Sequence, residues 1–197
     1  MLNTLSKDSI MATLIQQYGK LTLEDNAMCS SNNLFQDLVT IVIRQQLSNK
    51  IALTICQRVE TLRNGEIFPV KILAVSDIEL KKTGLSSNKI NYIKNIAYAI
   101  QNGSLKLEEM HKYSEPEVRL TLTKIKGIGQ WSTDMFLIFS LRFPNIFSFG
   151  DAGLIKAVQN LYGKNKMLSK EQIYAISEKW KPFRSYACLY LWKSLET

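Results

Sequence analysis

The chain has 197 residues, of which 46% are hydrophobic and 21% charged, a composition typical of a folded protein that dissolves in water. No apolar run approaches the roughly 18 residues that a membrane span needs, and the N-terminus lacks a secretory signal, so we expect a cytoplasmic protein without a membrane partner. The 25 basic and 17 acidic residues give a net charge of +8, which favours a polyanionic partner but also occurs in merely basic proteins.

The cysteines and the histidine give no pattern for a metal site. Cys29, Cys56 and Cys188 lie far apart and form no CxxC spacing, which argues against a disulfide framework, structural zinc or an iron–sulfur cluster. His111 is the only histidine, so a histidine triad or metal site is not expected. We therefore predict ordinary thiols, a surface histidine and no zinc or iron–sulfur cofactor.

Hydrophobic periodicity predicts an essentially all-α protein, because no stretch alternates apolar and polar residues for long. In chain order, helices are expected over 5–18, from 34 to the polar sequence RQQLS, from about 48 to 62, and over 87–101, 115–123, 131–142 and 152–162, with others after Ser169 and Pro182. Capping boxes, in which a serine precedes Glu or Gln by three residues, are predicted at three helix starts: Ser76/Glu79, Ser114/Glu117 and Ser169/Gln172.

Two features between residues 118 and 153 suggest chemistry. In IKGIGQW, Gly127 and Gly129 form a tight turn between two predicted helices, and the amides that open the second helix suit a phosphate group. Lys124 and Lys126 add positive charge, although a GxG turn can also be an ordinary helix connection. Asp151 follows in a Gly-Asp-Ala-Gly turn, where an aspartate alone would be read as a helix N-cap.

Beyond these patterns, IKGIGQWSTDMF followed by Gly-Asp-Ala-Gly resembles the helix–hairpin–helix base-excision DNA glycosylases, specifically the 3-methyladenine DNA glycosylase II branch. The stretches FQDLVTIVIRQQLSNKIA, GLSSNKINYIKNIA and WKPFRSYACLYLW also resemble that branch, so the similarity covers roughly residues 34–195. The resemblance implies two helical lobes with an active-site cleft between them. One is a barrel over 33–143 with the hairpin at about 115–142, and the other combines 1–32 and 144–197. Relatives often carry an additional N-terminal β-domain, and this chain begins too late to contain one. We therefore expect a minimal form of the family without that domain.

The resemblance implies a monofunctional DNA glycosylase that flips out alkylated purines and leaves an abasic site in base-excision repair. The expected substrates are of the 3-methyladenine type, with 7-methylguanine as a further candidate. Asp151 matches the essential acidic residue, which would stabilise the positive charge that develops on the deoxyribose. Relatives that also cleave the strand carry a lysine directly after the hairpin, where this chain has Trp131, so no lyase activity is expected.

The resemblance assigns the other site residues by position. The base pocket would contain Trp131 and Trp192, with Met135 where the best-known relatives have a tyrosine. The DNA-binding hairpin would comprise Lys124, Lys126, Gly127, Ile128, Gly129 and Gln130, and a Na⁺ or K⁺ ion would bind the backbone carbonyls of Thr123, Ile125 and Gly127. Gln46, with Leu47 beside it, would be the wedge that fills the space left by the flipped nucleotide; alternatively, Gln45 and Gln46 only link two helices.

The expected partner is double-stranded DNA with alkylated bases, bound by a monomer that is nucleoid-associated in a bacterial-type cytoplasm. Two alternatives remain open: a non-enzymatic helix–hairpin–helix DNA-binding protein, and a glycosylase for another damaged base. Asp151, Trp131 and Trp192 favour the enzyme over the binding protein.

Overall fold

The computed structural model describes residues 1–24, 33–62, 65, 67–164 and 166–196. Over these residues the chain forms helices and turns without a strand, which confirms the all-α prediction. Cys29 lies outside the described residues, whereas Cys56 and Cys188 are buried thiols. None of the described helices is both long and apolar enough to span a bilayer.

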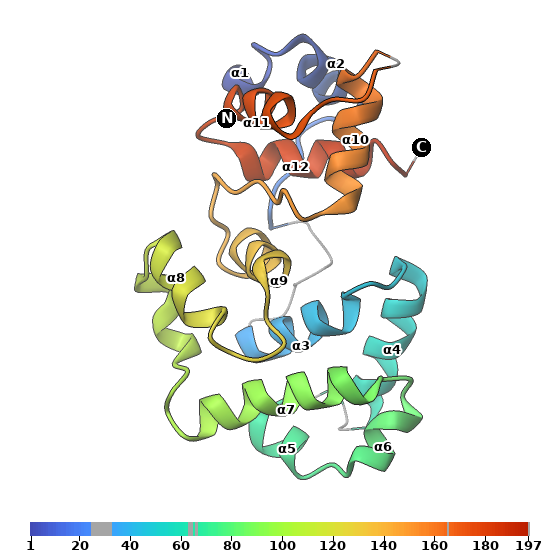
Figure 1. The fold of residues 1–197 in the computed structure, drawn as a ribbon, viewed down its shortest axis with the longest axis vertical. Helices are drawn as coiled ribbons and strands as arrows, with labels where there is room; N and C mark the ends of the chain where they lie inside the picture. The colour runs from blue at the N-terminus through green and yellow to red at the C-terminus, as the bar shows by residue number, and fades with distance from the viewer. Residues whose placement is uncertain (25–32, 63–64, 66, 165, 197) are drawn as a thin grey trace. The chain divides into compact units, whose positions relative to one another are not determined.

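The chain divides into two compact units, which are coloured along the sequence in Figure 1: unit 1 is Met1–Asn26 with Leu137–Thr197, and unit 2 is Ala27–Phe136. We expected the first lobe to span 33–143; the unit that contains the hairpin ends at Phe136. The helix that begins at Gln130 continues directly into the π-helical turn Phe136–Ser140. No glycine or proline therefore marks the boundary in the sequence.

Unit 2 is built around one long helix, α7 (Ser87–Gln101), which packs against α3, α5 and α6. Its buried side chains Ile90, Ile93 and Ile96 recur at helical spacing, as the sequence predicts. The other elements of unit 2 are α3 (Leu34–Arg44), α4 (Asn49–Thr61), α5 (Pro69–Leu73), α6 (Asp77–Lys82), the 3-10 helix η1 (Leu107–Lys112), α8 (Glu115–Leu122) and α9 (Gln130–Met135). The capping boxes predicted at the starts of α6 and α8 are both formed.

Unit 1 surrounds α12 (Arg184–Lys193), which packs against α2 and α10. Its other elements are α1 (Leu2–Leu5), α2 (Ser9–Tyr18), α10 (Ala152–Tyr162) and α11 (Lys170–Glu178), together with all but the first residue of the π-helical turn η2 (Phe136–Ser140). The expected single helix over 5–18 is wrong, because Asp8 accepts hydrogen bonds from the N–H groups of Ile10 and Met11 and so starts a new helix. The third predicted capping box, at the start of α11, is formed.

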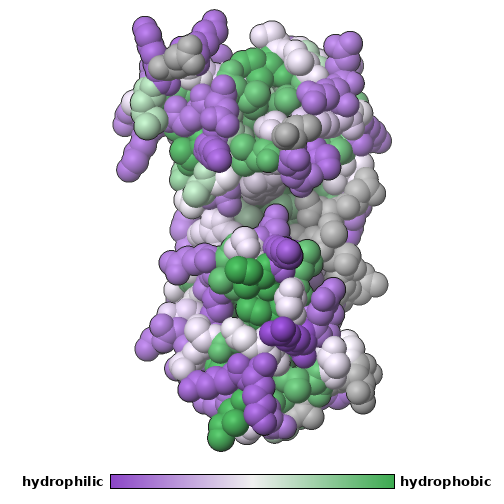
Figure 2. Space-filling view, turned by 90° about the vertical axis from the view of Figure 1, so that its right-hand side faces the viewer, coloured by the Kyte–Doolittle hydropathy of each residue, from purple (hydrophilic) through white to green (hydrophobic). Residues whose placement is uncertain are grey.

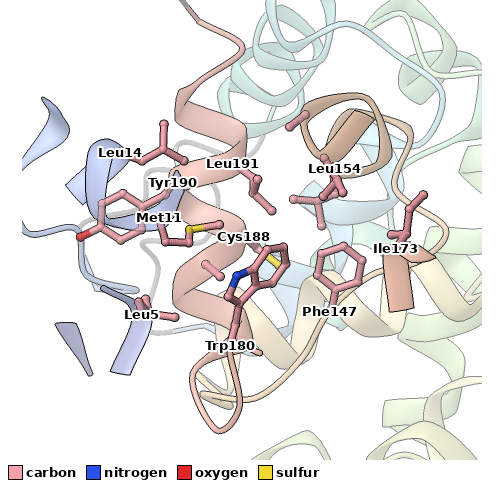
Figure 3. Packing of buried hydrophobic residues seen from close by; sticks show 13 residues of the cluster. Leu5, Met11, Leu14, Phe147, Leu154, Ile173, Trp180, Cys188, Tyr190 and Leu191 are labelled. Carbon is pink, nitrogen blue, oxygen red and sulfur yellow. The ribbon is translucent and has the colours of Figure 1, made fainter. Parts of the chain in front are cut away.

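The core of unit 1 joins the two ends of the chain. Figure 3 shows side chains from α1, α2, α10, α11 and the segments before α10 and α12 meeting those of α12. The labelled residues are Leu5, Met11, Leu14, Phe147, Leu154, Ile173, Trp180, Cys188, Tyr190 and Leu191. The hydroxyl of Tyr190 donates to the carbonyl of Gly19 at 2.9 Å and accepts from the N–H of Leu21 at 3.2 Å. The N-terminal segment is thus fixed to α12 by packing and by hydrogen bonds.

The surface in Figure 2 is mostly hydrophilic, with hydrophobic side chains between the charged ones. Lys124, Lys126 and His111 are all exposed, the last as expected. Large apolar side chains also reach solvent, as in most folded proteins, and they include Val70, Ile78, Leu120 and Met167.

Candidate functional site

The predicted hairpin is present, with α8 and α9 joined by a turn over residues 123–129. The N–H of Ile125 donates to the carbonyl of Leu122, and the N–H of Ile128 donates to the carbonyl of Ile125, both at 3.0 Å. Ile128 is buried and anchors the turn, whereas Gln130 is exposed at the start of α9. The first amides of a helix have no acceptor within that helix, so they are available to an anion.

The two hairpin glycines have different reasons to be glycine. Gly127 has φ of 106°, and a Cβ added there would lie 2.1 Å from Cγ of Tyr92. Both its backbone conformation and the neighbouring ring therefore require glycine. Gly129 has φ of −100°, and no protein atom lies within 4 Å of an added Cβ. The open space over Gly129 would allow an external group to approach the backbone closely.

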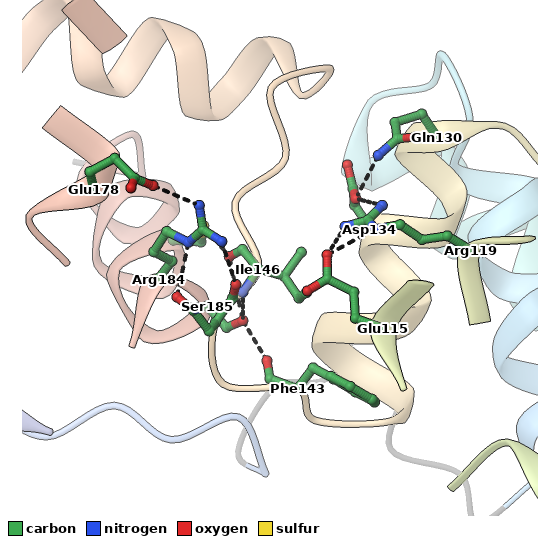
Figure 4. Close-up of polar contacts among 11 residues, drawn as sticks. Glu115, Arg119, Gln130, Asp134, Phe143, Ile146, Glu178, Arg184 and Ser185 are labelled. Carbon is green, nitrogen blue, oxygen red and sulfur yellow. Dashed lines mark hydrogen bonds and ion pairs between the residues drawn. The ribbon is translucent and has the colours of Figure 1, made fainter. Parts of the chain in front are cut away.

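A largely buried ion pair holds the two hairpin helices together. Arg119 on α8 contacts Asp134 on α9 at 2.6 Å, and the Asp134 side chain is only 2% exposed (Figure 4). Arg119 also contacts Glu115 at 2.9 Å. Burial alone would lower the pKa of Arg119, but the hydrogen bonds and charges of the two carboxylates raise it above its usual value. This pair was not predicted from the sequence, although an aspartate within the apolar run WSTDMFLIF was a signal for it.

The predicted wedge residues lie in the short connection between α3 and α4. Gln46 is exposed and has φ of 57°, a conformation that non-glycine residues adopt rarely, and Leu47 is half-buried. The side-chain amide of Gln45 donates to the carbonyl of Gly127 and to the hydroxyl of Ser132, both at 2.9 Å. Gln45 therefore connects the turn over residues 45–47, here called the wedge turn, to the hairpin. The side chain of Gln46 is exposed, and its role as the wedge stays a prediction.

Asp151 is the N-cap of α10, as expected from its place in the sequence. Its Oδ1 atom accepts from the N–H of Leu154 at 2.8 Å and from the indole N–H of Trp192 at 3.0 Å. The ring of Trp192 in turn packs against Phe139, with centroids 5.4 Å apart. A Cβ added at Gly153 would lie 3.1 Å from Oδ1 of Asp151, so the glycine leaves room for this pair. The half-buried carboxylate is thus held in one orientation.

The four residues expected around the damaged base are divided between the units. Asp151 and Trp192 belong to unit 1, whereas Trp131 and Met135 lie four residues apart on α9 in unit 2. Residues at that spacing share one face of a helix. Trp131 is half-buried and Met135 is buried, with 1% of its surface exposed.

A second polar cluster fixes the segment that leads to Asp151 (Figure 4). Arg184 donates to the side-chain and backbone oxygens of Asn145, each at 2.9 Å, and contacts Glu178 at 3.3 Å. The hydroxyl of Ser185 donates to the carbonyl of Phe143 and accepts from the N–H of Ile146 at 2.9 Å. These contacts tie the segment before Asp151 to the start of α12.

Two of the hairpin carbonyls predicted to bind a monovalent ion already accept a hydrogen bond within the protein. The carbonyl of Ile125 accepts from the N–H of Ile128, and that of Gly127 accepts from Gln45. A carbonyl oxygen has two lone pairs, so each keeps an acceptor direction, and neutral oxygens suit a weakly charged cation. Elsewhere in the described part of the chain, no three His, Cys, Asp or Glu residues are grouped to hold a metal.

The chain is similar to known DNA repair proteins over most of its length. The family described as "HhH-GPD superfamily base excision DNA repair protein" matches residues 39–183. DNA-3-methyladenine glycosylase 1 of Schizosaccharomyces pombe is 34% identical over 81% of this chain and 72% of its own length. A solved DNA-3-methyladenine glycosidase from Bacillus halodurans is 36% identical, with a TM-score of 0.81, over 98% of this chain and 88% of its own. A solved S. pombe 3-methyladenine DNA glycosylase in complex with abasic DNA is 30% identical, with a TM-score of 0.91, over 100% and 96%.

Proposed function

This chain belongs to the HhH-GPD superfamily of base excision DNA repair proteins, and on this basis we propose that it is a monofunctional DNA glycosylase for alkylated purines of the 3-methyladenine type. It would act on double-stranded DNA and leave an abasic site. The names of its relatives support the substrate class. The observation that carries the proposal is the carboxylate of Asp151, held at the start of α10 by Leu154 and Trp192.

The chemistry follows from the charge that develops as the base leaves. When the bond between C1′ and the base nitrogen breaks, its electron pair goes to the base and positive charge builds on the sugar. The negative charge of Asp151 would stabilise this state and orient the water that adds to C1′ and loses a proton. An alkylated purine already carries positive charge, so it leaves as a neutral base without a second acid.

Aromatic side chains would select the base. Trp131 and Trp192 can stack on an electron-poor ring through dispersion and cation–π attraction, and the bond from Trp192 to Asp151 fixes its indole. Met135 would make this part of the pocket more adaptable than the tyrosine of relatives. Because Trp131 stands where a lysine nucleophile would be, borohydride should trap no covalent complex with DNA.

The hairpin and the wedge turn would hold the DNA. The α9 amides together with Lys124, Lys126 and Gln130 suit phosphate groups, which carry no sequence information. A monovalent ion would bridge a phosphate and the carbonyls of Thr123, Ile125 and Gly127. Gln46, with Leu47, would enter the duplex in place of the flipped nucleotide. We expect the protein to be a monomer in the cytoplasm, and size-exclusion chromatography would measure its oligomeric state.

The deciding experiment is to incubate the protein with methylated duplex DNA and identify the released bases, using Asp151→Asn as the matched variant. Asparagine also caps helices, so the fold and the DNA affinity should persist. Release should fall by about 100-fold to 1,000-fold, the usual effect of removing one group that stabilises a transition state. DNA binding without release by the wild-type protein would instead support the non-enzymatic alternative.

A further inference from the structure

One face of α7 contacts both segments proposed to bind DNA. Lys89, Tyr92 and Asn95 recur every three residues and so lie on one side of the helix. Lys89 reaches the end of α3, the Tyr92 ring lies against Gly127, and the amide of Asn95 donates to the carbonyl of Lys126 at 3.3 Å. A single rigid helix therefore supports the wedge turn at one point and the hairpin at two others.

Lys89 acts on the last carbonyls of α3. Its ammonium donates to the carbonyls of Ile43 and Gln45, both at 2.7 Å. Carbonyls at a helix end lack donors within the helix and attract positive charge. Two simultaneous bonds from one ammonium fix the direction in which the chain leaves α3. Burial lowers the pKa of Lys89 below its usual 10.5, which agrees with an ammonium removed from water.

Gln45 is held at both its backbone and its side chain. Its carbonyl accepts from Lys89, and its side-chain amide donates to Gly127 and Ser132 of the hairpin region. The next residue, Gln46, has a left-handed backbone and an exposed side chain. A non-glycine residue keeps this conformation only where its surroundings hold it there. The hydrogen bonds of the neighbouring Gln45 hold the backbone at this point.

We propose that Lys89 is a positioning residue for nucleotide flipping, because it holds the wedge turn in register with the hairpin so that Gln46 can enter the duplex. The inference rests on the proposed function and on the wedge role of Gln46. The ammonium of Lys89 bonds to the carbonyls of Ile43 and Gln45, so in this proposal it acts through the wedge turn and not on the bond that breaks. Its loss should therefore slow the opening of the base pair and leave the cleavage of an already unpaired nucleotide unchanged.

The test compares single-turnover release from two duplexes with Lys89→Met, which keeps the aliphatic stem and removes the ammonium. In one duplex the methylated purine faces its pairing partner, and in the other it faces an abasic site, so no pair must be opened. We expect at least a tenfold slowing on the first duplex and a rate within twofold of wild type on the second. Gln46→Ala should give the same pattern, and the double variant should be no slower than the slower single variant.

The matched control is Lys94→Met on the same helix, since Lys94 pairs with the exposed carboxylate of Asp77 and should leave both rates unchanged. If Lys89→Met does not fold, Lys89→Arg and Gln46→Ala supply the same comparison of duplexes. Equal slowing on both duplexes would overturn the inference alone. Absence of release by the wild-type protein from either duplex would overturn the proposed function, and the inference with it.

Discussion

The indole N–H of Trp192 donates to Oδ1 of Asp151 at 3.0 Å, and the same oxygen accepts from the N–H of Leu154 at 2.8 Å. Apart from the stacking proposed for it, the tryptophan fixes the orientation of the carboxylate. The sequence places these residues 41 positions apart and gives no sign of the bond.

Trp192→Phe removes this donor and keeps an aromatic ring against Phe139. Hydrogen bonds to charged groups contribute roughly 1.5–3 kcal/mol, so we expect base release to slow by about tenfold or more while DNA affinity stays close to wild type. Single-turnover release and a binding titration measure the two effects. The control is Tyr186→Phe on the same helix, which removes a hydroxyl and keeps the edge contact of this ring with Phe183. A wild-type rate for Trp192→Phe would argue against a positioning role.

Gly127→Ala and Gly129→Ala should fail in different ways. Gly127→Ala places a Cβ onto the ring of Tyr92 and forces a positive φ on alanine, so its melting temperature should fall markedly. Gly129→Ala meets no protein atom, so it should melt like wild type and bind DNA more weakly if phosphate approaches the hairpin there. If Gly129→Ala bound DNA as tightly as wild type, this result would count against phosphate binding at the hairpin.

Arg119→Met should destabilise the hairpin by leaving Asp134 buried without its cationic partner. Breaking a buried ion pair typically costs about 3 kcal/mol or more, and urea unfolding measures the loss. The control is Lys106→Met, whose pair with Glu109 is exposed on both sides and should contribute little. Similar unfolding midpoints for the two variants would contradict the structural role of Asp134.

Glu117 makes the start of α8 sensitive to acid. Its carboxylate accepts from the hydroxyl and the N–H of Ser114, and these bonds lower the pKa of Glu117 below its usual 4.5. The unfolded chain therefore takes up this proton at a higher pH than the folded chain. The stabilisation is complete above pH 4.5 and disappears as the pH falls through the folded pKa. When the pH is lowered from 7 to about 3, the melting temperature of Glu117→Gln should fall less than that of wild type, because the variant has no carboxylate to protonate at this position. An equal fall would contradict this assignment.

Features set by neighbours in sequence were predictable. Ser76, Ser114, Ser169 and Asp151 all cap helices as their spacing indicates, because caps depend on residues one turn away. The break before α2 was predictable too, since Asp8 is a favourable N-cap, but helical periodicity over 5–18 concealed it.

Contacts between distant segments were not predictable in the same way. The bonds of Lys89 to α3 and of Gln45 to Gly127 join residues 44 and 82 positions apart, and nothing local distinguishes this lysine from the exposed ones. Arg119 and Asp134 face each other only because the hairpin turn sets two helices side by side. The family resemblance indicated which residues would contact DNA. The residues that hold them in place could be identified only from the three-dimensional structure.

The bonds from Tyr190 to Gly19 and Leu21 have a consequence for the order of folding during synthesis. Unit 2 is one continuous segment and is complete once the ribosome has released its last helix, whereas unit 1 waits for α12 at the far end of the chain. The nascent protein therefore gains its hairpin before Trp192 can reach Asp151. A ribosome that stalls before α12 is complete would leave a fragment that has the proposed DNA-binding elements and lacks the bond between Trp192 and the proposed catalytic carboxylate of Asp151.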